Sequence, residues 1–146
     1  MGKVVSKLMT TVVVDAYVLI ALVNKDDALA AKTVETLEGL YNKGAKLVYP
    51  STSIVEAVTA IQRKLNNPDL TNELSQMIKD SQFDVVSVDQ ATLEQAETLF
   101  KPYGSKQNTL FDAVVAATAK NIKADAVFSF DGWYEKIGLK LATSLI

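Results

Sequence analysis

Residues 12–23, VVVDAYVLIALV, decide how this chain folds. The stretch opens with three valines typical of a buried strand and continues as an apolar helical pattern, with one charge, Asp15, between the two parts. An ionised carboxylate is costly to bury inside a strand. We therefore place Asp15 where the strand ends and a helix begins, at the carboxyl edge of a sheet, where open α/β proteins hold their ligands.

The same alternation of strand and helix continues along the chain. Strands are predicted at residues 10–14, 46–49, 85–88 and 126–130, with a short last one at 139–144. Alternating strands and helices predict a mainly parallel sheet covered on both faces, which is a three-layer α/β/α sandwich of the α/β class. We expect residues 10–146 to form one domain, preceded by a short lead-in over residues 1–9.

Helix boundaries are marked by residues that favour caps and turns. Gly44 is expected to end an amphipathic helix, Asn66-Asn67-Pro68 to break the helix that starts near Ser53, and Asp89 to cap the helix that follows it. The helix ending at Gly44 is predicted to place its apolar residues on one side: Leu29, Val34, Leu37, Leu40 and Tyr41. Residues 110–120, rich in Ala and Val, predict a deeply packed helix.

The amino-acid composition limits which kinds of catalytic and metal site this chain can form. The chain has 146 residues, a net charge of −2, no cysteine and no histidine. These absences exclude disulfides, zinc sites built from thiolates or imidazoles, and Ser-His-Asp triads. The net charge provides no overall cationic field that would attract nucleic acid. Any catalysis must therefore depend on carboxylates, Lys, Tyr, Ser or Thr side chains and bound ions.

The sequence predicts no membrane association. No apolar run approaches the roughly 20 residues that a spanning helix needs. Asp15 also interrupts what would be the apolar region of a signal peptide. We expect a cytoplasmic protein.

Four acids are expected to lie at the edge of the sheet: Asp15, Glu56, Asp112 and Asp131. Each has a simpler explanation by itself. Asp15 fits an N-cap, residues 53–56 and 109–112 fit capping boxes, and Asp131 fits a turn with Gly132. Taken together, however, converging carboxylates repel one another, by about 4 kcal/mol for two charges 4 Å apart at an effective dielectric of 20.

Such a cluster either binds protons or binds a cation. Oxygen ligands without His or Cys favour Mg²⁺ or Mn²⁺, and carboxylate-held divalent ions activate water for phosphoester hydrolysis. Placement and composition thus predict a metal-dependent phosphoesterase.

The stretches that carry these acids also resemble a known family. In order, they are VVVDAYVLIAL (12–22), SIVEAV (53–58), LFDAVVAATA (110–119) and FSFDGWY (128–134). They are similar to the motifs of PIN domains, and in style to the small VapC-type toxins of toxin–antitoxin pairs. The resemblance runs from about Thr10 to the end of the chain. It implies an Mg²⁺- or Mn²⁺-dependent ribonuclease that leaves 5′-phosphate and 3′-hydroxyl ends on RNA.

The resemblance also implies roles for individual residues. The catalytic and metal-binding acids would be Asp15, Glu56, Asp112 and Asp131, with Asp15 and Asp112 as the most direct ligands. Ser129 occupies a position where the family often has a hydroxyl, and its alternative is an ordinary strand serine. Two departures are Ala16, where relatives commonly have Thr or Ser, and Gly-Trp-Tyr after the fourth acid. A VapB-like antitoxin and a homodimer are the partners that the family implies.

Basic residues that could meet RNA phosphates are few. Arg63 and Lys64 end the helix that carries Glu56, and Lys101 and Lys106 flank the loop before Asp112. The alternative for the loop is solvated surface.

Three other functions are considered. A haloacid-dehalogenase-like phosphatase would need a second Asp two residues after Asp15, where Tyr17 stands. A glycosidase with paired carboxylates would need aromatic platforms for sugars, and the chain has one Trp. A non-catalytic RNA-binding or assembly module with a PIN-like fold, whose acids serve as caps, is the non-enzymatic alternative.

Overall fold

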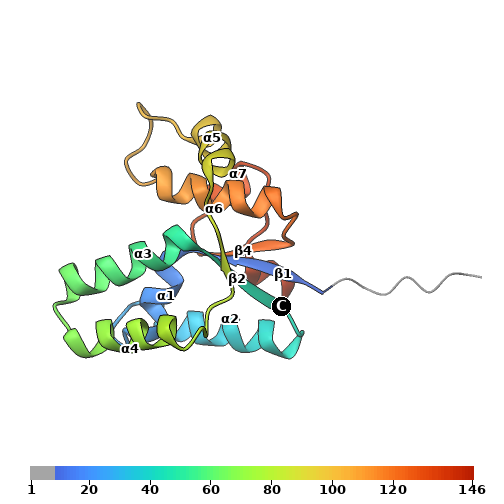
Figure 1. Ribbon diagram of the computed structural model, residues 1–146. Helices are drawn as coiled ribbons and strands as arrows, with labels where there is room; N and C mark the ends of the chain where they lie inside the picture. Colours follow the sequence, from blue (N-terminus) through green and yellow to red (C-terminus); the bar gives the residue numbers. More distant parts are fainter. Residues whose placement is uncertain (1–8) are drawn as a thin grey trace, which may run out of the picture.

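The computed structural model describes residues 9–146, so the predicted lead-in lies outside the described residues except for Met9. At its centre is a sheet of four parallel strands in the order β3-β2-β1-β4 (Figure 1). The strands are β1 (Thr11–Val14), β2 (Lys46–Pro50), β3 (Val85–Val86) and β4 (Ala126–Phe128). The predicted α/β class and parallel sheet are therefore confirmed.

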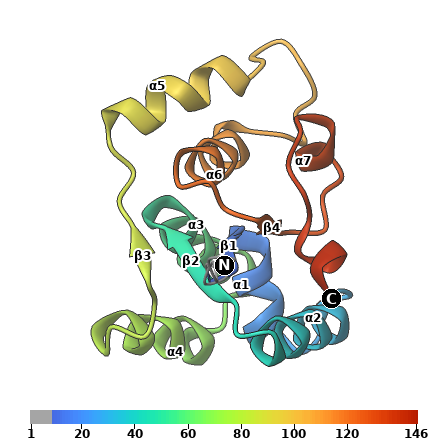
Figure 2. The same cartoon turned by 90° about the vertical axis from the view of Figure 1, so that its right-hand side faces the viewer.

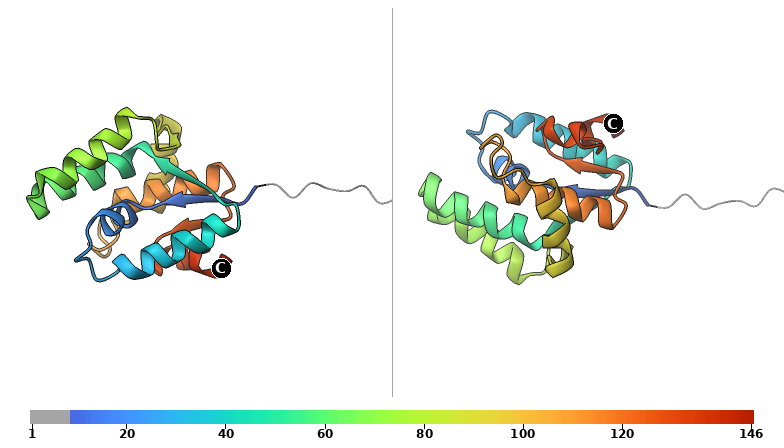
Figure 3. Two further views of the ribbon diagram at one scale, coloured as in Figure 1. Left: turned by 90° about the horizontal axis from the view of Figure 1, so that it is seen from below. Right: turned by 90° about the horizontal axis from the view of Figure 1, so that it is seen from above.

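Helices lie on both sides of this sheet, with α6 on one side and α2 on the other (Figures 1 and 2). Seen from below and from above, β1 runs through the middle of the molecule, with α2 on one side of it and α3 and α4 on the other (Figure 3). No helix in residues 9–146 is long and apolar enough to cross a membrane. The helices are α1 (Ala16–Val23), α2 (Ala30–Asn42), α3 (Ser51–Ala60), the π-helix η1 (Ile61–Leu65), α4 (Pro68–Lys79), α5 (Gln90–Leu99), α6 (Leu110–Asn121), α7 (Trp133–Lys136) and the 3₁₀ helix η2 (Ala142–Leu145).

The valines of β1 form the centre of the core. Val12 and Val14 pack with Leu40 of α2 on one face, while Val13 packs with Val115 of α6 on the other. All three valines of β1 are almost completely buried. A central strand of a parallel sheet is covered on both faces, which explains why its sequence is continuously apolar rather than alternating.

The predicted helix boundaries are largely confirmed. Gly44 has a positive φ of 68° just after α2, a conformation that glycine adopts without strain. Asn66 lies in the left-handed region, and Pro68 begins α4 after the N-cap Asn67, whose side chain accepts a hydrogen bond from the Leu70 amide. Asp89 caps α5 by accepting from the Thr92 amide.

One prediction about the fold is wrong, and another is confirmed only in part. Residues 139–144 do not form a strand: only Leu141 makes an isolated bridge to Val127, after which the chain turns into η2. In α2, Tyr41 is 82% exposed and Val34 is 43% exposed. Leu37 and Leu40 pack in the core as predicted, and Thr33 and Thr36, at helical spacings of three and four residues, complete the buried side of α2.

Candidate active site

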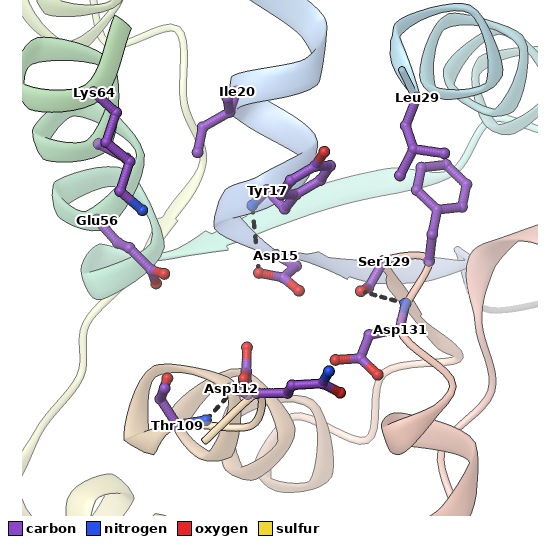
Figure 4. A pocket seen from close by; sticks show the side chains of 13 residues that line it. Asp15, Tyr17, Ile20, Leu29, Glu56, Lys64, Thr109, Asp112, Ser129 and Asp131 are labelled. Carbon is purple, nitrogen blue, oxygen red and sulfur yellow. Dashed lines mark hydrogen bonds between the residues drawn. The ribbon is translucent and has the colours of Figure 1, made fainter. Parts of the chain in front are cut away.

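All four predicted acids line one cleft of about 420 Å³ (Figure 4). Asp15 follows β1, Asp131 follows β4, Asp112 lies in the first turn of α6, and Glu56 lies in α3 directly after β2. Parallel strands end at the same edge of a sheet, so residues far apart in sequence meet there. The structure therefore confirms that these four side chains converge on one cleft.

Asp15 is both a helix cap and a residue of the cleft. Its side chain is 7% exposed and accepts hydrogen bonds from the Tyr17 amide at 3.4 Å and the Tyr134 hydroxyl at 3.2 Å. Burial, and then the charge of Asp112, raise the pKa of Asp15 to about 6, although hydrogen bonds from Ser129, Tyr17 and Tyr134 oppose that rise. The ionised form of this carboxylate is therefore disfavoured by its surroundings in the cleft.

Glu56 points into the cleft from α3 (Figure 4). Burial, and then the charges of Asp15 and Asp112, raise its pKa to about 7, and the Lys64 ammonium opposes that rise. The predicted capping box at residues 53–56 is wrong, because α3 begins at Ser51, immediately after Pro50. Glu56 thus lies beyond the first turn, where no backbone amide needs a cap.

Asp112 belongs to a capping box, as its sequence context predicts. One of its oxygens accepts from the Thr109 amide at 3.0 Å. The side chain points across the cleft toward Asp15 (Figure 4). Burial raises the pKa of Asp112, and the charge of Asp131 adds to the rise, while the bond from Thr109 opposes it. The cap orients this carboxylate without neutralising it.

Asp131 is held more firmly than the other three acids. One oxygen accepts from the Trp133 amide at 2.9 Å, and the other accepts from the Asn108 side-chain amide at 2.8 Å. Its own backbone amide donates to the Ser129 hydroxyl at 3.1 Å. The predicted turn therefore exists, and Ser129, which is buried, orients the backbone of the fourth acid.

Two residues that support the acids were not predicted. Tyr134 is fully buried, and its hydroxyl reaches Asp15 from α7. A buried tyrosine usually finds a hydrogen-bond partner for its hydroxyl, so its place three residues after Asp131 was a usable signal. Asn108 carries no comparable signal in the sequence. Lys101 and Lys106 are exposed and do not line the cleft, whereas Gln107 and Thr109 of the same loop do.

The donor set fits a hard divalent cation. The cleft offers carboxylate oxygens that raise one another's pKa, and the chain has no His or Cys that would favour zinc. Within residues 9–146, no three acidic side chains are grouped closely enough to form a finished ligand set.

The raised pKa values predict how the stability of the metal-free protein depends on pH. Asp15 and Glu56 bind protons more tightly folded than unfolded, because their pKa values rise from 3.8 to about 6 and from 4.5 to about 7. The stability that they contribute is present below about pH 4 and is lost as the pH rises to about 7. Urea unfolding of the wild type and of Glu56→Gln should therefore diverge over this range, with the variant gaining relative stability as the pH rises. Parallel pH curves would contradict the prediction.

Comparisons with known proteins place this geometry in a family. Residues 12–139 match the family model of the PIN domain. No curated protein sequence matches the chain significantly. Among solved structures, the chain is similar to VapC20 of Mycobacterium tuberculosis, described as a sarcin-ricin loop cleaving toxin (17% identity, TM-score 0.72, covering 88% of this chain and 95% of that one).

It is also similar to FitAcB of Neisseria gonorrhoeae (18% identity, TM-score 0.64, covering 89% of this chain and 95% of that one). A third similar structure is a toxin-antitoxin complex from Klebsiella pneumoniae (17% identity, TM-score 0.53, covering 83% and 87%). At such identities the likeness to the solved structures shows a shared fold, and the family model supplies the assignment. From the match over residues 12–139, the chain belongs to the PIN domain family.

Proposed function

We propose that this protein is a divalent-metal-dependent ribonuclease that hydrolyses RNA phosphodiester bonds. The observation that carries the proposal is the gathering of four carboxylates in one cleft at the carboxyl edge of the sheet. Membership of the PIN domain family supports it, since that family consists largely of such nucleases. A chain without histidine can hydrolyse phosphoesters in this way, because a metal ion replaces the usual general base.

We further propose that the ribonuclease is the toxin of a VapBC-type pair in the cytoplasm. The similar structures include a VapC toxin described as cleaving the sarcin-ricin loop and a toxin-antitoxin complex, which supports an RNA substrate and an antitoxin partner. A homodimer belongs to the same proposal. Co-expression with the small protein encoded next to this gene, followed by co-purification, is the direct check on the partner.

In the proposed mechanism, Asp15 and Asp112 would hold the metal ion directly, and Glu56 and Asp131 would complete the site. When bound, Mg²⁺ or Mn²⁺ would supply an activated water and neutralise charge on the phosphate oxygens. The protein orients these ligands through bonds that the structure shows: Tyr134 holds Asp15, Thr109 holds Asp112, and Asn108 and Ser129 hold Asp131 and its backbone. These supports preorganise the site.

A thermal-melt titration with Mn²⁺ tests the metal site without requiring activity. At 100 times its dissociation constant, an ion bound only by the folded state stabilises by about 2.7 kcal/mol, which corresponds to roughly 5–10 °C for a domain of this size. Asp131→Asn should lose most of this shift. Asp89→Asn is the matched control, because Asp89 caps α5 outside the cleft and should leave the Mn²⁺ shift intact.

The same titration separates the ribonuclease from a non-catalytic module whose acids are only caps. Such a module predicts no Mn²⁺ shift in any of these proteins. Incubation of the wild type with a mixed-sequence RNA and Mn²⁺ completes the test. Absence of both the shift and 5′-phosphate products would end the ribonuclease proposal.

A further inference from the structure

One positive charge faces the acids of the cleft. Of the residues that line it, Lys64 alone is basic, against four carboxylates. Within residues 9–146, the one ion pair closer than 4 Å joins Lys46 to Asp84, far from this site. The Lys64 ammonium lies on the same wall as Glu56 (Figure 4). It therefore faces the cleft without a carboxylate bound to it.

The π-helix explains why Lys64 rather than Arg63 faces the cleft. Glu56, Ala60 and Lys64 line it at intervals of four residues. Along a regular α-helix, a residue eight positions after Glu56 would be rotated by about 80° from it. The i→i+5 bonding of η1 (Ile61–Leu65) takes more residues per turn and returns Lys64 to the side of Glu56. Arg63 is rotated off this side and does not line the cleft.

The direction of the side chain agrees with this register. Side chains on a helix lean toward its N-terminus. The long stem of Lys64 accordingly runs back toward Glu56, and the ammonium lies near the acids (Figure 4). π-turns inside helices occur frequently at functional sites. Here the π-helix η1 has an identifiable effect: it places the Lys64 ammonium, rather than the Arg63 guanidinium, on the side of the helix that lines the cleft.

We propose that Lys64 binds a phosphate of the RNA beside the acid cluster, and that the π-helix η1 sets it in position for this contact. The inference rests on the proposed ribonuclease function. An ammonium in a cleft of four acids draws the RNA backbone where the acids alone would repel it. An ammonium on a flexible stem is a common phosphate ligand and adapts to the position of the phosphate.

The test uses a short single-stranded RNA, with its binding measured by fluorescence anisotropy in Ca²⁺ over a range of KCl concentrations. Ca²⁺ is chosen as a hard, oxygen-binding ion for the acidic site. Lys64→Met should weaken binding about tenfold, as the loss of one charge-assisted contact implies. It should also lower the slope of log affinity against log salt by about 0.7, the share of one phosphate on a single strand. Lys64→Arg should restore the slope.

Arg63→Ala is the matched control, because it removes an equal charge from the neighbouring residue outside the cleft. The proposal predicts that this variant keeps the wild-type affinity and slope. Equal losses in Arg63→Ala and Lys64→Met, or an unchanged slope in Lys64→Met, would overturn the assignment. If Lys64 served only to offset the charge of Glu56, Lys64→Met would alter the midpoint of a Mn²⁺ melt titration and leave the salt slope unchanged.

These outcomes are distinct from a failure of the ribonuclease proposal. If the wild-type protein cleaves RNA and Lys64→Met leaves the salt slope unchanged, only the proposed phosphate contact is rejected. If wild-type protein neither binds nor cleaves RNA with divalent ions present, the proposed function falls and the phosphate contact falls with it.

Discussion

Asp112→Asn is expected to lower the rate of Mn²⁺-dependent RNA cleavage by about a thousandfold or more. The substitution removes a carboxylate from the centre of the acid cluster while keeping an oxygen that can accept the Thr109 amide. The cap of α6 should therefore be retained, and the substitution should lower the rate of cleavage without unfolding the helix. Several kcal/mol of transition-state stabilisation by a metal ion correspond to such a factor, at 1.36 kcal/mol for each tenfold change in rate.

The rate should be measured in single turnover, with gel separation of end-labelled RNA. Asp125→Asn is the matched control, because Asp125 is exposed and accepts from the Thr11 amide outside the cleft. We expect the control to cleave at the wild-type rate. Activity of Asp112→Asn within tenfold of wild type, in a folded protein, would exclude Asp112 as a direct metal ligand.

Asp15→Asn should stabilise the metal-free protein and at the same time abolish its response to metal. The ionised Asp15 is buried beside Asp112, which raises its pKa from 3.8 to about 6. That shift makes its ionised form costly by about 3 kcal/mol above pH 7. Asparagine carries no charge and is an equally good N-cap for α1. We expect the melting temperature in EDTA at pH 7.5 to rise by roughly 5–10 °C.

The prediction is easily contradicted, because Asp15→Asn should raise the melting temperature in EDTA and yet remove the stabilisation by Mn²⁺. In EDTA the variant should melt above the wild type, and in saturating Mn²⁺ the wild type should gain stability while the variant does not. A substitution that merely damaged the fold would lower both melting temperatures. A destabilised Asp15→Asn protein in EDTA would show that Asp15 serves the fold rather than the cleft.

The fold was predictable because its main signals are local. The valine run before Asp15 and the Ala- and Val-rich helix 110–120 both describe elements buried on most sides, and both lie where they were expected. The convergence of the acids followed from topology, since each was placed after a strand or in the first turns of a helix at one edge. Strand ends were less predictable, and β3 is only Val85–Val86.

What could not be predicted depends on contacts between distant segments. Tyr134 meets Asp15 across 119 positions of sequence, and no local pattern encodes that pairing. The position of Lys64 in the cleft depends on the π-helix η1, which the sequence pattern did not predict, so that Arg63 and Lys64 were named together. In α2, Thr33 and Thr36 are buried while Tyr41 is exposed, and the Thr36 hydroxyl donates to the Lys32 carbonyl at 2.8 Å, a contact that the apolar pattern does not reveal.

The pairing of β1 with β4 has a consequence for how the site forms during synthesis of the chain. Asp15 donates its amide to the Phe128 carbonyl and receives the Tyr134 hydroxyl, so its surroundings are built from the two extremes of the described chain. During synthesis on the ribosome, the first of the acids emerges long before the residues that fold around it. The surroundings of Asp15 in the cleft are therefore complete only after translation has passed residue 134.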